Sequence, residues 1–307
     1  MLLAVTESSG SSPGRSGYKM AVAPDGELIG SIGGGVMEVS LVEKAKEILS
    51  GAGSIATGLR DPKIVDQIHR KNVPNSSGMI CSGKQTVIFK QLVGDDLTTV
   101  KGIIDSLRRR SRDILRISLS EFTVTPSADA GKTDDFKFKK EPGGGFEFEE
   151  KLGPKNDLII VGGGHCALAL SELMSKMDFH ISLFDDRPEL NTIEKNRFAD
   201  EIAIVDGYDQ IGELINEGPD VYVVVMTLGY KFDKLVIERL LDRDFKYFGV
   251  LGSRAKIKTL LSELKKEGFD ADRLSRIHTP IGIAINSRTP EEIAVSIAAE
   301  IIAIKNT

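Results

Sequence analysis

The segment from Leu158 to Met177 constrains the fold of this chain more than any other. It begins with an apolar run, Leu158 to Val161, passes through three consecutive glycines, and continues as a helical pattern over Ala167 to Met177. A strand that turns into a helix through glycines brings main-chain N–H groups to the helix start, where they bind anions such as phosphates. The sequence therefore predicts a phosphate-binding strand-turn-helix unit in the C-terminal half.

Three small residues of this turn, Gly162, Gly164 and Ala167, match the G-x-G-x-x-G/A spacing of dinucleotide-binding proteins. Gly162 permits the tight turn, Gly164 lets a phosphate approach the backbone, and Ala167 allows close helix packing. Asp185 ends the next predicted strand, roughly 20 residues further on, where the fingerprint has an acid that binds a ribose hydroxyl. Arg187 suits either an additional phosphate or an ion pair with neighbouring acids, so the nucleotide stays open. The alternative is that the glycines only let a helix pack on a sheet.

Predicted strands and helices alternate through the rest of this half. The strands are His180–Phe184, Ile202–Val205, Val221–Met226 and Tyr247–Leu251, and the helices are Gly207–Asn216, Phe232–Leu241 and Lys256–Lys266. Continuous apolar strands separated by helices are typical of a parallel sheet covered on both faces. We therefore expect a doubly wound, Rossmann-like α/β domain over residues 155–307.

The last predicted helix begins at Thr289-Pro290-Glu291-Glu292, which combines a cap, a proline at the first helical position and a glutamate that reaches back. Its apolar stretch, Ile293 to Ile304, is suited to a core or to an interface, so a homodimer is one expectation.

The pattern of short strands and helices in the first half of the chain predicts a smaller α+β domain over residues 1–125. Its strands are Leu2–Thr6, Tyr18–Ala23, Glu27–Ile32, Gln85–Leu92 and Ile114–Thr123, and its helices are Val36–Leu49 and Leu97–Arg109. Residues 126–154 are rich in Ser, Asp, Lys and Gly and indicate a linker, in which Phe146–Glu150 alternates like an edge strand. A length of 307 residues suits two domains.

Two further turns are candidate anion cradles. At Gly252, Ser253 and Arg254, a predicted strand again enters a helix, and N–H groups and a guanidinium suit a phosphate or a carboxylate. If that strand lies beside the first one, both turns contact a single ligand. His165, in the first turn, is either a ligand contact or a capping or surface residue.

In the first half, Gly34 and Gly35 precede a helix and form another potential cradle, near Arg15 and Lys19. Glu38, one turn into that helix, either complements the helix dipole or contacts a ligand.

The composition, with 41% hydrophobic and 28% charged residues and a net charge of -5, indicates a globular protein. The basic residues are scattered, so we expect no nucleic-acid partner. Without a long apolar stretch or a secretory signal, we expect no membrane segment and a cytoplasmic protein.

The two cysteines, Cys81 and Cys166, agree with a reducing compartment and are too few for an all-cysteine zinc site, and we predict no metal site. Cys81, between glycines, is either a buried small hydrophobe or a reactive thiolate suited to sulfur or metal chemistry.

These segments together resemble the xanthine dehydrogenase accessory protein family, the XdhC/CoxI group, over nearly the whole chain apart from the predicted linker. The resemblance rests on GSSPGRSGYKM, GSIGGGVME and GMICSG in the first half, and on LIIVGGGHCALAL, FDDRPE, GVLGSR and PIGIAINSRTPEEIAVSIAAEI in the second.

The resemblance implies a cofactor-binding chaperone rather than a catalyst. Such proteins bind the molybdenum cofactor (molybdopterin or its dinucleotide form), support its sulfuration with a cysteine desulfurase, and deliver it to the apo-enzyme of a molybdenum hydroxylase. The phosphate or nucleotide end would be held by Gly162, Gly164, His165, Asp185 and Arg254, while Cys81 would face the metal or its sulfur. An NAD(P)-dependent oxidoreductase and a nucleotide-sensing scaffold are the alternatives.

The chain departs from the family pattern at three places. Val36 stands where many relatives have the cysteine of a GGCxE pattern, which argues against a mechanism with paired thiols. The turn Thr227–Tyr230 lacks the histidine that many relatives carry, so no role is transferred to it. The chain also begins inside the first predicted strand, without the helix that usually precedes it, so we expect a short N-terminus.

Overall fold

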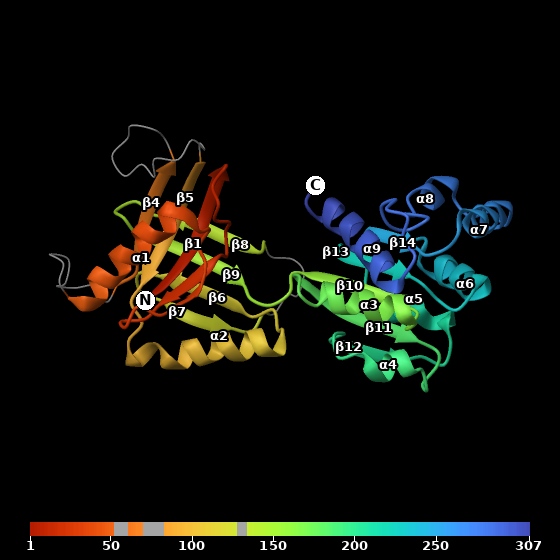
Figure 1. Ribbon diagram of the computed structural model, residues 1–307, viewed down its shortest axis with the longest axis horizontal. Coiled ribbons are helices and arrows are strands. Elements are labelled where there is room, and N and C mark those ends of the chain that lie inside the picture. Colours follow the sequence, from red (N-terminus) through yellow and green to blue (C-terminus); the bar gives the residue numbers. More distant parts are fainter. Residues whose placement is uncertain (52–60, 70–82, 128–133) are drawn as a thin grey trace. The chain divides into compact units, whose positions relative to one another are not determined.

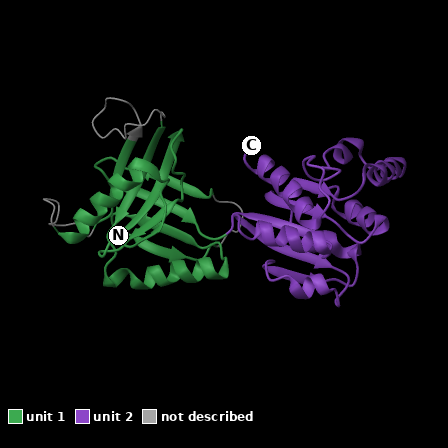
Figure 2. Cartoon of the chain, viewed as in Figure 1, with its two compact units in different colours: residues 1–153 green, residues 154–307 purple. Residues whose placement is uncertain are grey.

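The chain folds into two compact units, Met1–Gly153 and Pro154–Thr307, coloured separately in Figure 2. The structure, a computed structural model, describes residues 1–51, 61–69, 83–127 and 134–307. Each unit has its own hydrophobic core.

Unit 2 is a Rossmann-like α/β fold, as the sequence predicts, with one five-stranded parallel sheet and helices on both faces (Figure 1). Its strands are β10 (Asn156–Val161), β11 (Phe179–Asp185), β12 (Glu201–Ile204), β13 (Gly218–Val225) and β14 (Phe245–Val250). Its helices are α3 (His165–Met174), α4 (Asn191–Lys195), α5 (Ile211–Leu214), α6 (Tyr230–Leu240), α7 (Arg254–Lys266), α8 (Ala271–Ser275) and α9 (Pro290–Lys305). The strand order is β12-β11-β10-β13-β14, with every pair parallel.

The central strand β10 is buried on both faces of the sheet. Leu158 and Ile160 are in the apolar cluster that includes residues of α3 and α9. Ile159 and Val161 point the other way, into the cluster that includes residues of α6 and α7. Successive side chains of a strand alternate between faces, so a continuous apolar run is the pattern that a doubly covered strand requires.

Helix α9 belongs to this core. Thr289 and Glu292 form the predicted capping box, and Pro290 occupies the first helical position. The face that contains Ala294, Ile297, Ala298 and Ile301 is buried among residues of α3 and the sheet. The apolar stretch therefore serves the core of unit 2, and the homodimer stays a prediction.

Unit 1 is the predicted α+β fold and contains two antiparallel sheets. The first has the order β3-β2-β1-β5-β4, with β1 (Leu2–Gly10), β2 (Lys19–Val22), β3 (Leu28–Gly30), β4 (Lys63–His69) and β5 (Gly83–Lys90). The second has the order β7-β6-β9-β8, with β6 (Ile114–Ser118), β7 (Phe122–Thr125), β8 (Phe136–Lys140) and β9 (Phe146–Lys151). The helices are α1 (Gly35–Ser50) and α2 (Leu97–Arg109). Leu3 and Val5 pack against α1, whereas Ala4 joins residues of the second sheet in a separate cluster.

The segment expected to be a linker, residues 126–154, instead supplies two strands of unit 1. Strand β9 lies between β6 and β8 rather than at an edge. Phe146 and Phe148 are buried because alternate residues of β9 face the apolar cluster shared with β6. The interpretation as a linker was wrong because polar composition and a glycine run outweighed this alternation; the units divide after Gly153.

Among the helices of the described residues, none combines the length and the apolarity that crossing a bilayer requires.

We expect Thr289→Ala to lower the free energy of unfolding of unit 2 by about 1 kcal/mol, because the first turn of α9 loses its side-chain cap. Urea unfolding followed by tyrosine fluorescence measures this, since the chain has no tryptophan and four of its five tyrosines lie in unit 2. Thr259→Ala, an exposed threonine inside α7, is the matched control and should change little. Equal effects of the two substitutions would contradict the capping role.

Candidate functional site

The carboxyl ends of the parallel strands form one edge of the sheet in unit 2, and the glycine loop lies at the middle of this edge. The chain moves outward from β10 to β12 and then returns to the other side of β10 as β13. Ligands of open α/β sheets bind in the crevice where the strand order reverses. The loops after β10 and β13 are therefore the first candidates for a ligand site.

The three glycines of the loop after β10 differ in the space that surrounds them. Gly162 has φ 110°, and a Cβ there would lie 2.4 Å from the carbonyl oxygen of Met226, so only glycine allows this loop to touch the loop after β13. A Cβ on Gly163 would meet Ile193 at 2.8 Å. A Cβ on Gly164 would meet nothing within 4 Å. The first two glycines serve internal packing, and the third borders open space.

The open space lies at the N-terminus of α3. Gly164 is the N-cap residue and provides no side chain to cap the first turn. The N–H of Gly162 donates to Phe184 at 2.8 Å and the N–H of Gly163 donates to Asp185 at 2.6 Å, so the amides before Gly164 are already bonded. The start of α3 thus offers main-chain donors and the positive end of a helix dipole to an anion.

Asp185 braces the glycine loop. Its side chain is fully buried, and its two oxygens accept from the N–H of Gly163, from the N–H of Arg187 at 2.9 Å, and from the Arg187 guanidinium at 2.9 and 2.7 Å. Burial by itself would raise the pKa of Asp185, but the hydrogen bonds from Arg187 and Gly163 outweigh it and hold the pKa below its ordinary value. A ribose hydroxyl can bind Asp185 only if Arg187 moves away.

His165 and Cys166 begin helix α3 near the first turn of α9. His165 is exposed and Cys166 is half-buried. Burial, and then the negative charge of Glu291, raise the pKa of the Cys166 thiol, so this cysteine is protonated near neutral pH. Glu291 therefore places a negative charge close to the start of α3.

The turn after β13 was left without a role by the sequence, yet it lies beside the glycine loop. Thr227 donates to Asp233 through its N–H at 3.1 Å and its hydroxyl at 2.5 Å, and Lys256 pairs with the other oxygen of this buried carboxylate. Gly229 begins α6 without a side-chain cap, and a Cβ on it would meet nothing within 4 Å. The order of strands in a doubly wound sheet, rather than any motif, is the signal that points to this turn.

The turn after β14 lies at the same edge of the sheet but not beside the first turn. Strand β13 separates β14 from β10, so the two turns are about 10 Å apart at ordinary strand spacing. The condition under which both turns would contact a single ligand, that the two strands are adjacent, is therefore not met. Ser253 caps α7 by accepting from the N–H of Lys256 at 3.3 Å, and Arg254 is exposed in the first turn. Gly252 is half-buried, so of the three residues Arg254 is the one free to reach an anion.

A hollow of about 380 Å³ follows β12 at the other end of the same edge. Its lining includes Val205, Asp206, Gly207, Asp209 and Gln210. It carries acids and an amide but no basic side chain, so it suits amino groups of a base better than a phosphate.

In unit 1, the carboxylate of Glu38 accepts hydrogen bonds from the residues that precede its own helix. One oxygen of Glu38 accepts from the hydroxyl of Ser31 at 2.7 Å and from the N–H groups of Ile32 and Gly34 at 2.8 and 3.0 Å. Burial would raise the pKa of Glu38, but these hydrogen bonds lower it overall. Gly34 and Gly35 both have positive φ, at 75° and 70°, as the turn requires.

Three segments that are distant in the sequence meet in unit 1. A Cβ on Gly33 would lie 2.4 Å from the nitrogen of Gly14, and a Cβ on Gly83 would lie 2.6 Å from the nitrogen of Ser12. The glycine-rich segments at 10–20, at 30–35 and at the start of β5 are thus in contact. Lys19, a candidate cation of this region, pairs with Glu150 at 2.5 Å, while Cys81 lies outside the described residues.

Across the described ranges of the chain, no three side chains among His, Cys, Asp and Glu gather in a way that could hold a metal ion.

Two family models match the chain. One, described as the XdhC Rossmann domain, matches residues 158–301, and the other, described as the XdhC and CoxI family, matches residues 1–57. The chain belongs to the XdhC and CoxI family. The glycine loop, Asp185 and the turns after β13 and β14 all fall inside the XdhC Rossmann match, and the contacting glycines Gly14 and Gly33 fall inside the other.

Curated relatives of this XdhC family chain are longer proteins. An uncharacterized Escherichia coli protein, YqeB, is 22% identical over 302 residues, which are 98% of this chain and 43% of that protein. A Bacillus subtilis protein, described as a probable xanthine dehydrogenase subunit, is 32% identical over 155 residues, which are 50% of this chain and 44% of that protein. The chain therefore spans less than half the length of these two relatives.

A crystal structure from Bacillus halodurans, described as a xanthine dehydrogenase, has the same fold. The TM-score is 0.69 at 24% identity, and the match covers 99% of this chain and 91% of that one.

We expect Asp185→Asn to lower the free energy of unfolding at pH 7 by about 2 kcal/mol, because the charge-assisted hydrogen bonds to Arg187 and Gly163 are weakened. The carboxylate stabilises the fold above its ordinary pKa of about 4, and this contribution is lost as the pH falls through the lowered pKa of the folded state. The difference in free energy of unfolding between wild-type protein and Asp185→Asn should therefore become smaller below about pH 4.

Urea unfolding at a series of pH values from neutral downward measures this effect. Asp186→Asn is the control, since Asp186 is partly exposed and its oxygen lies 3.8 Å from Arg187. A loss of stability for Asp185→Asn that did not vary with pH would show that the charge of Asp185 is not what braces the loop.

Proposed function

We propose that this chain is an accessory factor for the maturation of a molybdenum hydroxylase of the xanthine dehydrogenase type. It binds the molybdenum cofactor, supports its sulfuration and delivers it to the apo-enzyme. Membership in the XdhC and CoxI family supports this role, as does the likeness to the Bacillus subtilis protein described as a probable xanthine dehydrogenase subunit. The structural observation that carries the proposal is the open, uncapped N-terminus of α3 at the reversal point of the sheet.

The residues at this edge fit a phosphate. Gly164 leaves room beside the first amides of α3, and no side chain competes for these donors. Asp185 is neutralised by Arg187, so the nearest acid behind the loop does not repel an anion. Arg254, exposed at the same edge, offers a guanidinium to a second phosphate or to a carboxylate. Main-chain amides and one planar cation are what a pyrophosphate requires.

The dinucleotide form of the pterin fits the edge better than the mononucleotide form. The hollow after β12 is two strands from β10, about 10 Å away at ordinary spacing, which is the reach of a nucleoside joined to a bound pyrophosphate. Asp206 and Gln210 line the hollow and suit the amino group of a base. In this proposal the glycine loop holds the phosphates and the hollow takes the base.

A carrier must also release its cargo. Glu291 lies close enough to the start of α3 to raise the pKa of Cys166, and the same negative charge weakens the hold on a phosphate there. Moderate affinity is what transfer to an apo-enzyme needs. The molybdenum hydroxylase apo-enzyme and a cysteine desulfurase are the proposed partners, and the cytoplasm is the proposed location.

An NAD(P)-dependent oxidoreductase is the second candidate, because the spacing of Gly162, Gly164 and Ala167 is that of dinucleotide-binding proteins. The burial of Asp185 against Arg187 disfavours it, since the acid expected to bind the ribose is already occupied. Fluorescence titration with reduced nicotinamide nucleotides separates the candidates, and micromolar binding would favour the oxidoreductase.

We expect Gly164→Asp to abolish cofactor binding without destabilising the fold. The position has φ -70° and open space for a Cβ, so aspartate is tolerated and can cap α3, while its charge occupies the proposed phosphate site. The measurement is mass spectrometry of small molecules released from protein that is co-produced with the enzymes of cofactor biosynthesis.

Gly94→Asp is the matched control in unit 1, because a Cβ there also meets nothing within 4 Å. Wild-type protein and Gly94→Asp should both release a molybdenum pterin, and Gly164→Asp should release at least tenfold less. Equal release from Gly164→Asp would exclude the start of α3 as the phosphate site.

The sulfuration step leads to a separate expectation about the two cysteines. We expect Cys81→Ala to lower the fraction of released cofactor that carries the added sulfur, and Cys166→Ala to leave it unchanged, since the raised pKa of Cys166 keeps that thiol unreactive. The same mass spectrometry distinguishes the sulfurated from the oxygen form. A loss caused by Cys166→Ala instead would assign the sulfur chemistry to unit 2.

A further inference from the structure

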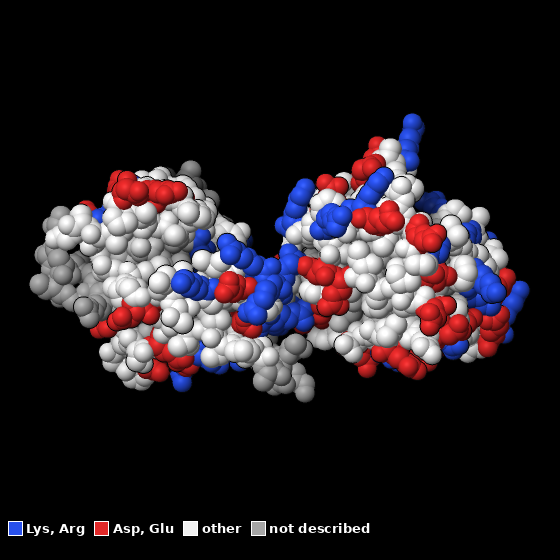
Figure 3. All heavy atoms as spheres, turned by 90° about the horizontal axis from the view of Figure 1, so that it is seen from below, with Lys and Arg blue, Asp and Glu red and all other residues white. Residues whose placement is uncertain are grey.

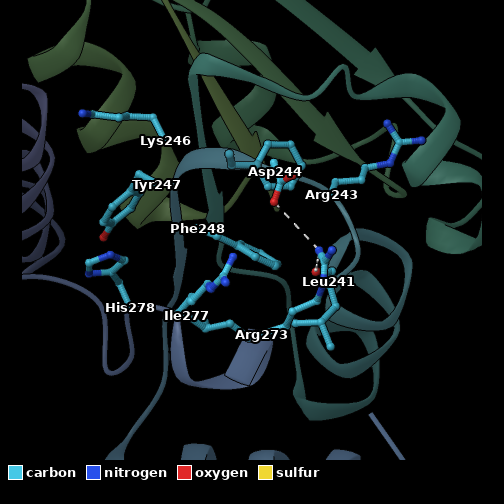
Figure 4. Close-up of a pocket in the computed structure, with 11 residues that line it drawn as sticks. Leu241, Arg243, Asp244, Lys246, Tyr247, Phe248, Arg273, Ile277 and His278 are labelled. Atoms are coloured by element: carbon cyan, nitrogen blue, oxygen red, sulfur yellow. Dashed lines mark hydrogen bonds and ion pairs between the residues drawn. The ribbon is translucent and has the colours of Figure 1, made fainter. Parts of the chain in front are cut away.

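Unit 2 contains a second cavity, of about 250 Å³, beside the edge strand β14 (Figure 4). Its lining begins at Leu241 and Arg243, before the strand, and continues only to Phe248. The opposite wall comes from α8 and the residues after it, including Arg273 and His278. The cavity therefore lies toward the amino end of β14, whereas the glycine loop and Arg254 lie at carboxyl ends, so the two sites are separate.

The lining of this cavity is strongly basic. Arg243, Lys246, Arg273 and Arg276 contribute four cations, and Asp244 is the one acid among the lining residues. The chain as a whole has a net charge of -5, and on the face of unit 2 seen in Figure 3 acidic side chains are mixed with basic ones. A local excess of positive charge in an acidic protein favours an anionic ligand.

Two of the four cations, Arg276 and Lys246, form no hydrogen bond or ion pair with other described side chains, and Lys246 points away from Phe248 in Figure 4, so Arg276 is the cation placed to bind such a ligand. Arg243 donates to the carbonyl of Ile215 at 2.7 Å, and Arg273 lies 3.9 Å from Asp244 and donates to the carbonyl of Leu241 at 3.3 Å. The side chain of Arg276 forms no hydrogen bond and no ion pair within 4.0 Å among the described residues, although its charge, after the backbone hydrogen bond from Arg273, helps to lower the pKa of Asp270 at the start of α8. Its planar fork of donors matches the two oxygens of a carboxylate.

Aromatic rings form the rest of the cavity. Phe248 projects into the middle of the view in Figure 4, between Tyr247 and His278 on one side and Arg273 on the other. Its ring packs edge-on against Phe245, with centroids 5.8 Å apart, which leaves it half-buried. A half-exposed aromatic face beside an unpaired guanidinium suits a flat ring that carries negative charge.

The wall formed by Tyr247 and His278 is held rigidly. Their rings stack with centroids 4.6 Å apart. Glu300 of α9 accepts from the Tyr247 hydroxyl at 2.5 Å and from the N–H of Gly282 at 2.7 Å, and its other oxygen lies 3.5 Å from Nδ1 of His278. The backbone of His278 also pairs with β14 through Phe248 and Val250. This wall is therefore preformed, and binding does not need to order it.

We propose that this cavity is a binding site for a small planar organic anion, whose ring packs on Phe248 and whose oxygens bind Arg276. A volume of about 250 Å³ is below the range of about 300 to 1,000 Å³ of drug-sized ligand sites, so the occupant is a single ring or a fused pair rather than a dinucleotide. This site is independent of the proposed cofactor role of the glycine loop.

The test is titration of the full chain with three probes, benzoate, benzamide and inorganic phosphate, followed by the ring resonances of histidine. The chain has four histidines, so substitution assigns each resonance. Benzoate should shift the resonances of His278 in a saturable way and leave those of His180, on β11, unchanged. Benzamide, without the charge, and phosphate, without the ring, should each bind at least tenfold more weakly.

Two variants and a control complete the test. Arg276→Gln removes an exposed cation and should weaken benzoate binding at least tenfold, and Phe248→Leu should weaken it severalfold through loss of the ring contact. Lys266→Gln makes the same change of charge at the exposed end of α7, outside the cavity, and should have no effect. Absence of saturable benzoate binding, equal binding of benzamide, or full binding by Arg276→Gln would each overturn the proposal. Cofactor retention, which depends on Gly164, should be the same in Arg276→Gln.

Discussion

The burial of β10 on both faces is the constraint on which the rest of unit 2 depends. Its four successive apolar residues from Leu158 to Val161 must meet helices above and below the sheet. Because crossovers between parallel strands are right-handed, helices on both faces require a reversal of strand order, and the reversal falls beside β10. The crevice for a ligand, the uncapped start of α3 and the contact between two loops all follow from this arrangement.

In the glycine loop, the amides of Gly162 and Gly163 are hydrogen-bonded within the protein, and only the end at Gly164 borders open space. Asp185 and Phe184 accept from the first two amides, and Gly162 meets the carbonyl of Met226, with no room for a Cβ. Asp185 is the acid of the dinucleotide fingerprint. Its oxygens already accept hydrogen bonds from the loop and from Arg187, so its role in this conformation is structural. A phosphate-binding carrier is consistent with that use, since it needs the amides more than a ribose contact.

In unit 1 and at the cavity beside β14, segments that are distant in the sequence lie side by side. In unit 1, close contacts of Gly14 with Gly33 and of Gly83 with Ser12 join three segments that the family resemblance had named separately. Beside β14, Arg243 from before the strand lines the same cavity as Arg273 of α8 and Arg276 after it. Neither grouping has a local sequence signature, because each depends on which backbones lie side by side.

Three local features could be predicted from the amino-acid pattern alone: the strand-turn-helix at Gly162 to Gly164, the capping box of α9 and the alternation of apolar strands and helices. These could be predicted because hydrophobic period, glycine conformation and capping act over a few residues. Three other features could be seen only in the folded chain: β9 lies inside a sheet, β13 separates the turns at Gly164 and Arg254, and the Arg187 guanidinium donates hydrogen bonds to Asp185. Those outcomes depend on strand order and on side chains meeting across the core, and long-range packing rather than local propensity determines both.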